Sequence, residues 1–277
     1  MKIKYLGTAA AEGIPAIFCQ CEICRKAMEL GGRNIRTRSQ ALIDETLLID
    51  FPADTYAHFL KEKFPLSKIK ACLITHSHSD HLYPIEIEMR KDDYAHIENK
   101  EPLTFYGDES AYSLLRQAIE KVHIEENVVK NVLITPFVSF ETEGYFVMPI
   151  RASHDSWSSP VVYLIEKDGK SLLYAHDTSD FIEESWNCLK KFGKKIDFIS
   201  FDCTAGTAPM QYVGHMNLQR CIDMRKKMVR LGLADSSTIC VLNHFSHNGE
   251  NVLYDTFSEI AQKEGFWVSY DGMEMTF

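Results

Sequence analysis

Long hydrophobic runs are absent from this sequence. No stretch of about 18 or more apolar residues occurs, so we expect no transmembrane helix. Residues 1–7 carry basic side chains but no apolar segment of the length that a signal peptide needs. We therefore expect a cytoplasmic protein, whose eight cysteines would be reduced thiols, metal ligands or core residues rather than disulfides.

An excess of positive charge is also lacking. Asp and Glu number 39 against 30 Lys and Arg, which gives a net charge of −9 at pH 7. This balance disfavours a general nucleic-acid surface, which needs clustered Lys and Arg. It does not exclude a small anionic substrate, because a metal ion at the site would dominate the local field.

The sequence also contains no linker, internal repeat or low-complexity segment. Nothing in the 277 residues suggests a domain boundary, and 45% apolar residues suffice for a sizeable core. We therefore predict one domain over residues 1–277. Strands come first and then alternate with helices in both halves of the chain. This order predicts an α/β fold of two mixed sheets packed together, with helices outside.

Hydrophobic periodicity and turn residues place the individual elements. The expected strands are Lys2–Leu6, Gln40–Ile43, Thr46–Ile49, Ile69–Thr75, Leu103–Tyr106, Val132–Pro136, Phe146–Ile150, Val161–Ile165, Ser171–Ala175, Asp197–Phe201, Thr238–Leu242, Phe266–Ser269 and Glu274–Thr276. The expected helices are Asp54–Lys63, Glu109–Val122, Phe181–Phe192, Asn217–Leu231 and Val252–Lys263.

The segment that indicates chemistry most clearly follows the expected strand at residues 69–75. It contains four potential metal ligands in six residues, namely His76, His78, Asp80 and His81. On an extended chain the first two point to the same side, and a turn brings the others to the same place. Imidazole nitrogens and a carboxylate suit Zn²⁺, Mn²⁺ or Fe. The alternative is a solvated polar loop.

Three more candidates, His154, Asp177 and His244, each follow an expected strand. The carboxyl ends of strands are where sites gather in layered α/β proteins. A single such residue is usually a surface or core residue. Three of them together with the first cluster favour one shared site.

A second metal site is indicated by Cys19, Cys21 and Cys24, spaced Cys-x-Cys-x-x-Cys. Three thiolates this close suggest zinc, and a closed zinc site leaves room for one His from elsewhere. Free thiols or a redox pair are the alternatives. The other five cysteines lie in apolar runs or near strand ends and are expected mostly in the core.

The pattern His-x-His-x-Asp-His, followed by a later His, Asp and His, resembles the metallo-β-lactamase superfamily over essentially the whole chain. The resemblance implies a four-layer αββα sandwich with two divalent ions, Mn, Zn or Fe, at one edge of the sheets. It implies one metal held by His76, His78 and His154, the other held by Asp80, His81 and His244, and Asp177 bridging both. Asp rather than Cys at the bridging position is typical of the phosphodiesterase, lactonase and nuclease branches.

Other motifs resemble the cyclic phosphodiesterase branch of the carbon–phosphorus lyase (phosphonate) pathway. These are Leu6-Gly7-Thr8 through Gly13-Ile14-Pro15 with the Cys cluster, and Tyr270-Asp271-Gly272-Met273-Glu274. That branch binds a structural zinc through three Cys and a late His. The resemblance implies that His244 joins the catalytic pair and that His247, three residues later, joins the structural zinc.

Supporting residues are expected around the metals. His215 precedes the helix at 217–231, and the resemblance implies a general acid, with an exposed His as the alternative. Asp50 and Asp202 end strands and are expected to accept the second N–H of metal-bound imidazoles. Asp80 is expected to be essential for turnover as well as a ligand.

Weaker expectations concern the surroundings of the site. Tyr83, Trp157 and Tyr212 are candidates for lining a pocket, and Arg151 for meeting a substrate phosphate. His176 is expected to point away from the site. The sequence pattern favours a surface position for His58, His96 and His123.

The resemblance implies a metal-dependent hydrolase, specifically a phosphodiesterase of small cyclic diesters such as a ribose 1,2-cyclic phosphate. A hydroxide held by two metals would attack phosphorus. The alternatives are a tRNA 3′-processing-like endonuclease, a lactone or thioester hydrolase, and a non-catalytic metalloprotein resembling the pyrroloquinoline-quinone B-protein. The expected partner is a small anionic phosphodiester, with no nucleic acid and no membrane; the resemblance is compatible with a homodimer.

Overall fold

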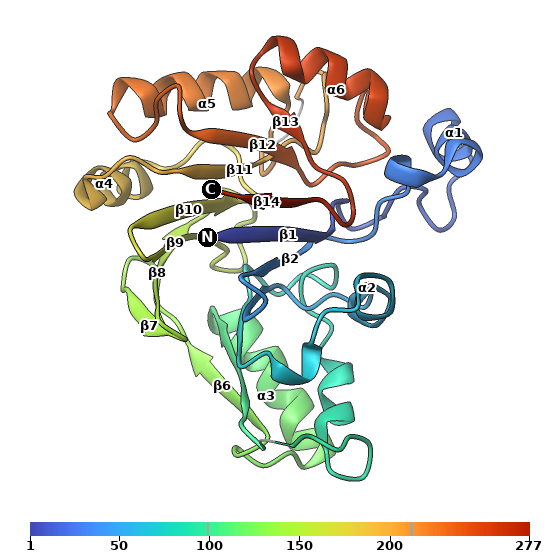
Figure 1. The fold of residues 1–277 in the computed structure, drawn as a ribbon, viewed down its shortest axis with the longest axis vertical. Helices are drawn as coiled ribbons and strands as arrows, with labels where there is room; N and C mark the ends of the chain where they lie inside the picture. The colour runs from blue at the N-terminus through green and yellow to red at the C-terminus, as the bar shows by residue number, and fades with distance from the viewer. Residues whose placement is uncertain (99, 211–212) are drawn as a thin grey trace.

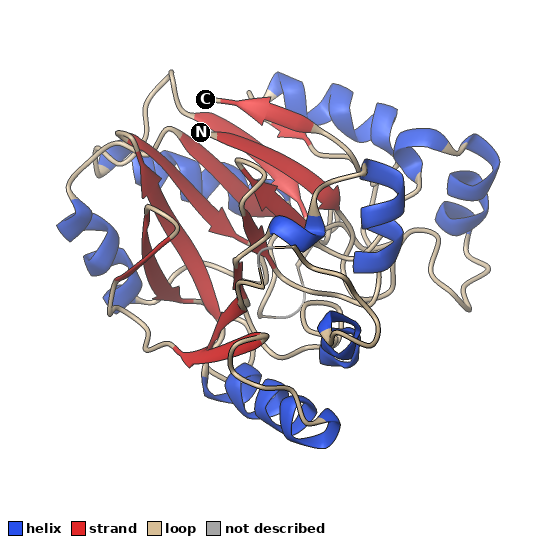
Figure 2. Cartoon of the chain, turned by 60° about the horizontal axis from the view of Figure 1, so that its bottom comes forward, coloured by secondary structure: helices blue, strands red, loops and turns tan. Residues whose placement is uncertain are grey.

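Two sheets pack face to face, with helices on their outer sides, in the computed structural model of this protein (Figures 1 and 2). The structure describes residues 1–98, 100–210 and 213–277, so that Tyr212 lies outside the described residues. The α/β sandwich predicted from the order of elements is confirmed. Within the described residues each sheet has seven strands.

The first sheet has the order β14-β1-β2-β3-β4-β5-β6. Its strands are β1 (Lys2–Gly7), β2 (Gln40–Ile43), β3 (Leu47–Ile49), β4 (Ala71–Leu73), β5 (Leu103–Gly107), β6 (Val129–Leu133) and β14 (Glu274–Thr276). The pairs from β14 to β3 are antiparallel, and those from β3 to β6 are parallel. The last strand of the chain thus closes the edge of the sheet beside the first, and Figure 1 shows both termini there.

The second sheet has the order β13-β12-β11-β10-β9-β8-β7. Its strands are β7 (Phe140–Thr142), β8 (Tyr145–Arg151), β9 (Val161–Lys167), β10 (Lys170–Ala175), β11 (Phe198–Asp202), β12 (Ile239–Asn243) and β13 (Trp267–Val268). The pairs from β7 to β10 are antiparallel and those from β10 to β13 are parallel. Both sheets therefore follow the same plan.

Helices cover the two outer faces. They are α1 (Glu22–Leu30), α2 (Thr55–Glu62), α3 (Glu109–Val122), α4 (Glu183–Phe192), α5 (Leu218–Arg230) and α6 (Tyr254–Lys263), with short 3₁₀ turns at Gly32–Asn34, Leu66–Lys68 and Pro84–Arg90. Asp108 caps α3 by accepting from the amide of Ala111, and Asn217 caps α5 by accepting from that of Arg220. Each cap satisfies a backbone donor that a helix start would otherwise leave without a partner.

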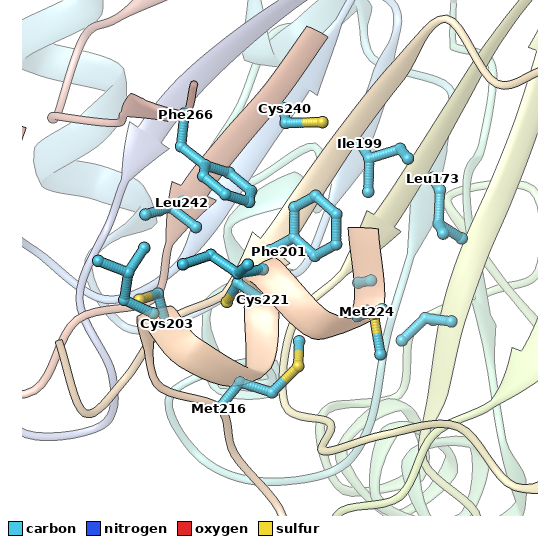
Figure 3. Packing of buried hydrophobic residues seen from close by; sticks show 14 of the residues in the cluster. Leu173, Ile199, Phe201, Cys203, Met216, Cys221, Met224, Cys240, Leu242 and Phe266 are labelled. Atoms are coloured by element: carbon cyan, nitrogen blue, oxygen red, sulfur yellow. The ribbon is translucent and has the colours of Figure 1, made fainter. Parts of the chain in front are cut away.

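Three apolar layers hold the sandwich together. The layer between the sheets contains tyrosines whose hydroxyls are paired: Tyr5 shares a 2.7 Å hydrogen bond with Ser200, and Tyr163 donates to the carbonyl of Ile74 at 2.7 Å. α3 packs on the first sheet, and α4, α5 and α6 pack on the second. Figure 3 shows Cys221 and Met224 of α5 against the strands of the second sheet.

The elements differ from expectation mainly at exposed positions. The strand predicted at 132–136 lies at Val129–Leu133, where its backbone pairs with β5. Its apolar residues Val132 and Leu133, which suggested a buried strand, are exposed at the edge of the sheet. α1 and β7 were not predicted; α1 is short and largely exposed.

The surface position expected for His58 is wrong. Its side chain is 1% exposed, with Nδ1 2.6 Å from Oε1 of Gln40 and Nε2 2.7 Å from Oγ1 of Thr37.

Candidate metal centre

The predicted site residues meet at one end of the sandwich. His76 follows β4, while Asp177 and His244 follow the parallel strands β10 and β12. Asp50, Asp177 and His244 all adopt positive φ angles, of 66°, 50° and 65°. Such backbone is costly for non-glycine residues and gathers at functional sites. Here it turns three side chains out of their strands and toward the same edge.

One group of side chains contains His76, His78 and His154, whose ligand atoms lie within 4.8 Å of one another. Nδ1 of His78 is 2.9 Å from Nε2 of His76 and 3.2 Å from Nε2 of His154. These are the three residues expected to share one metal.

A second group contains Asp80, His81 and His244, again within 4.8 Å. Asp177 lies between the two groups. Its Oδ2 is 3.0 Å from Nε2 of His81 and 3.0 Å from Nε2 of His244, while its Oδ1 is 3.6 Å from Nε2 of His154. The structure therefore brings all seven predicted ligands of the dinuclear site together, with Asp177 in the position expected of a bridge.

The polar atoms at the centre of these groups fit a cation. Nε2 of His81, Nε2 of His244 and Oδ2 of Asp177 are buried and make no hydrogen bond of acceptable geometry to the described residues. Buried polar atoms are normally paired, so unsatisfied ones require an explanation. Imidazole nitrogens and a carboxylate oxygen converging on one point are the donor set that Zn²⁺, Mn²⁺ and Fe accept.

Two buried carboxylates hold the far sides of the candidate ligands. Asp50 accepts from Nδ1 of His81 at 2.7 Å and from the amide of Thr75 at 2.8 Å. Asp202 accepts from the backbone amide of Asp177 at 3.0 Å. Asp50 thus holds a candidate ligand as expected, and partners of this kind fix the direction of metal-binding imidazoles. Asp202 differs from expectation, because its imidazole partner at 3.0 Å is His215 rather than one of the expected ligands.

Two threonine hydroxyls that lie against the Nδ1 atoms of candidate ligands were not predicted. Oγ1 of Thr75 is 3.1 Å from Nδ1 of His76, and Oγ1 of Thr204 is 2.9 Å from Nδ1 of His244. The sequence offers one signal for these threonines. Each follows the end of a strand by two residues, Thr75 after β4 and Thr204 after β11.

His215 lies at the rim of the cluster. Its Nδ1 is 3.0 Å from Oδ2 of Asp202 and 3.9 Å from Oδ1 of Asp177. Burial lowers the pKa of His215, but the carboxylate of Asp202 outweighs this and raises the pKa to about 9. The imidazole of His215 thus lies next to the expected ligands, with a ring nitrogen within 4.8 Å of ligand atoms of Asp177, Asp202 and His244.

Burial and neighbouring charges shift the pKa values of the candidate ligands in opposite directions. Burial lowers the pKa of His76 and His244, whereas at His81 the nearby carboxylates outweigh burial and raise the pKa, so that metal binding there must displace a proton. Burial would raise the pKa of Asp177, but His244 and His81 lower it well below the usual range. Neutral imidazoles and an ionised carboxylate are the protonation states that bind a metal.

The cysteine cluster forms a separate site at the start of α1. Cys19, Cys21, Cys24 and His247 offer ligand atoms within 4.8 Å of one another. Nδ1 of His247 is 3.4 Å from Sγ of Cys19 and 3.6 Å from Sγ of Cys21. Cys21 also caps α1, its sulfur accepting from the amide of Cys24. Three sulfurs and one imidazole fit the tetrahedral site that zinc prefers.

The remaining residues named from the sequence lie at different distances from the cluster. His176 is buried beneath the cluster, where its Nε2 is 2.7 Å from Oγ of Ser200, and it belongs to none of the described ligand groups. Trp157 lies against His78, with ring centroids 5.0 Å apart. Tyr83 is partly buried, and its amide donates to the carbonyl of Phe51. Arg151 is exposed at the end of β8.

The two-sheet sandwich thus carries, at one sheet edge, clustered His and Asp side chains that form a donor set for divalent metal ions. The chain belongs to the beta-lactamase superfamily: residues 46–233 match the family model described as the beta-lactamase superfamily domain. This fold implies bound divalent metal ions.

Two curated relatives match the sequence. The chain is 24% identical over 283 aligned residues to an octanoyltransferase of Porphyromonas gingivalis, covering 99% of this chain and 51% of that protein. It is 26% identical over 174 residues to ribonuclease Z of Leuconostoc mesenteroides, covering 61% of this chain and 49% of that protein. The chain thus spans about half the length of the curated relatives it matches.

Solved structures share the fold along the whole chain. Zn²⁺-bound PqqB from Methylobacterium extorquens superposes with a TM-score of 0.76 at 19% identity, covering 100% of both chains. A diphosphatase of the PhnP family gives 0.76 at 20% identity, covering 100% of this chain and 97% of that one. Human tRNase Z, short form, gives 0.66 at 18% identity, with 100% and 99% covered. Among the described residues, no helix combines the length and apolar character needed to span a membrane.

Proposed function

We propose that this protein is a phosphodiesterase that hydrolyses a small cyclic phosphate diester with two divalent metal ions. The observation that supports this most directly is the position of Asp177, whose two carboxylate oxygens face two different groups of ligands. One group would be His76, His78 and His154, and the other would be Asp80, His81 and His244. A bridging carboxylate between two complete groups is what a dinuclear site requires.

Two metal ions held this way would supply a nucleophile at neutral pH and charge stabilisation for an in-line displacement at phosphorus. The residues of the chain supply the rest. Asp50 and Asp202 hold the imidazoles of His81 and His215 in fixed directions. Since Nδ1 of His215 bonds to Asp202, its Nε2 would donate a proton to the departing oxygen.

The cysteine site would hold a structural zinc through Cys19, Cys21, Cys24 and His247. The turn from His244 to His247 joins it to the catalytic cluster within three residues. A small anionic diester would be the partner. The homodimer compatible with the sequence resemblance remains a proposal for solution measurement.

The first test is hydrolysis of bis(p-nitrophenyl) phosphate after Mn²⁺ loading, with Asp177→Ala measured alongside. We expect turnover by the unaltered protein and a loss of at least ~100-fold in kcat/KM in the variant, because one carboxylate organises both metals. Asp93→Ala removes an exposed carboxylate and serves as the matched control. Full activity of Asp177→Ala with metal still bound would refute the proposal.

A panel of substrates distinguishes phosphodiester hydrolysis from the alternative activities of such a site. Ribose 1,2-cyclic phosphate should be hydrolysed, and lactones and thioesters should not, because the latter react at carbon. Turnover of the carbon substrates alone would assign the same site to acyl chemistry. Absence of all hydrolysis with metals confirmed bound would favour a non-catalytic metalloprotein.

A nuclease is the second candidate, and the 26% identity with ribonuclease Z favours it. The net charge of −9 counts against binding of a large polyanion. A gel shift with precursor tRNA at physiological salt, together with a cleavage assay, decides between the two. Retention and 3′ cleavage of the tRNA would make this the preferred function.

A further inference from the structure

Among the residues of the candidate metal centre, His78 is the most exposed, followed by His215 at 18%. The side chain of His78 is 31% exposed, whereas His154 is 9%, Asp80 8%, Asp177 4% and His244 1% exposed. His76 and His81 are fully buried. His78 is therefore the ligand most accessible to a substrate that arrives from solvent.

Trp157 is the aromatic neighbour of this ligand. Its ring lies against the ring of His78, with centroids 5.0 Å apart and planes inclined by 42°. The indole is nevertheless 65% exposed, which makes it one of the most exposed large apolar side chains of the described residues. A single exposed aromatic is unremarkable on a protein surface, but here it adjoins the most accessible ligand of the cluster.

The loop that carries Trp157 is fixed at its base. Oδ1 of Asp155 accepts from the amide of Trp157 at 3.0 Å and from that of Ser158 at 2.7 Å. The amide of Ser159 donates to Oδ2 of Asp108, the residue that caps α3. An aromatic ring presented on a fixed backbone loses little conformational entropy when a ligand covers it.

The charges around His78 do not select for phosphate. Asp155 lies 3.9 Å from Nε2 of His78, and the carboxylates of Asp80 and Asp177 lie deeper in the site. Recognition of the phosphate would thus rest on the metals, and the indole offers a surface for an uncharged, planar group next to it. Bases stack on such rings irrespective of their hydrogen-bonding edges.

We propose that Trp157 is a specificity-determining residue, which stacks on a planar aromatic ring carried by the substrate next to the phosphodiester. The preferred substrate class is then the nucleoside cyclic phosphates, with cyclic phosphates of a bare sugar hydrolysed less efficiently. This inference rests on the proposed phosphodiesterase function. It assigns the organic part of the substrate, which the metal ligands leave open.

The test compares adenosine 2′,3′-cyclic phosphate with ribose 1,2-cyclic phosphate, which has no base. For Trp157→Ala we expect kcat/KM to fall roughly 5- to 100-fold on the adenosine substrate, the usual effect of losing one stacking partner. The same variant should hydrolyse the base-free substrate within about twofold of the unaltered protein, since stacking energy is absent there. Trp157→Phe keeps a ring and should recover most of the loss.

Trp267→Ala is the matched control, because Trp267 is 54% exposed and lies on β13. It should alter neither substrate. An equal loss on both substrates in Trp157→Ala would show that the indole only supports His78, and no loss on either would show no contact with substrate. Either result overturns the inference while leaving the proposed phosphodiesterase function intact.

A binding measurement keeps the two proposals separable. Adenosine 3′-monophosphate should quench the tryptophan fluorescence of the unaltered protein, and ribose 5-phosphate should not. The quenching should persist in Trp267→Ala and disappear in Trp157→Ala. If no diester is hydrolysed, the proposed function fails, and the titration alone decides on Trp157: equal quenching in all three proteins overturns the stacking role.

Discussion

At the scale of single residues, the candidate site depends on side chains whose orientation is set by hydrogen bonds. His215 is the clearest case for function, because Asp202 holds its Nδ1 at 3.0 Å and directs the ring toward the cluster. We expect His215→Ala to lose ~10²- to 10⁴-fold in kcat with metal content unchanged, as is usual for a missing general acid.

The measurement for His215 is kcat together with metal content by atomic emission. His96→Ala, which removes an exposed imidazole, is the control. Loss of metal in His215→Ala would reassign His215 from proton donor to ligand. Unchanged kcat would remove it from the mechanism.

His58 gives a prediction about stability and pH. Burial lowers its pKa to about 4 from the ordinary value of 6.5, so the unfolded chain binds the proton more tightly. The contribution of neutral His58 to the free energy of unfolding is therefore present above pH 6.5 and is lost as the pH falls toward 4. Between pH 7 and pH 5 the loss from this residue alone is about 2 kcal/mol.

Urea unfolding of His58→Gln at both pH values checks this. The variant should lose less stability between pH 7 and pH 5 than the unaltered protein, while His123→Gln should behave like the unaltered protein. An identical pH dependence in all three would mean that His58 does not contribute. The surface position expected for His58 from sequence fails for the same reason: Thr37 and Gln40, which satisfy both ring nitrogens, come from other parts of the chain.

At the scale of elements, the turn after β12 joins the two candidate metal sites. His244 faces the dinuclear cluster, Phe245 is buried beneath the guanidinium of Arg36, and His247 faces the cysteines. The backbone of this turn pairs with the first residues after β1 through Ala9 and Ala10. A shift at one end of the turn therefore moves the other.

We expect His247→Ala to lose zinc from the cysteine site and also to lower metal occupancy at the dinuclear site, with a fall in kcat/KM of ~10- to 100-fold, as for other residues that orient ligands. Metal content per chain and activity are measured together, with His96→Ala as control. Normal metal at the dinuclear site in the zinc-depleted variant would show that the turn holds its shape without the zinc.

At the scale of the whole molecule, the candidate metal ligands come from both halves of the sandwich. Asp80 and His81 lie in the segment that follows β4 of the first sheet, and Asp177 and His244 follow β10 and β12 of the second. The amide of Val161 donates to the carbonyl of Thr75 across the same edge. Metal bound there would tie the halves of the sandwich together. Without it, several carboxylates are buried side by side.

Removal of the metals should therefore destabilise the entire fold. A ligand that binds only the folded state at 1,000 times its Kd adds about 4 kcal/mol to stability. We expect chelation to lower Tm by several degrees and readdition of Mn²⁺ or Zn²⁺ to restore it. Scanning calorimetry measures this, and an unchanged Tm after complete metal removal would contradict it.

The sequence by itself determined the layered α/β class, most strands and helices, and the residues that gather at the metal centre. It could do so because apolar periodicity follows burial, and because the ligands follow strands whose carboxyl ends share an edge. Tertiary structure alone decided the rest. The position of α1, the burial of His58, and the contacts of Thr75 and Thr204 with the ligand imidazoles depend on contacts between distant segments, which no local pattern encodes.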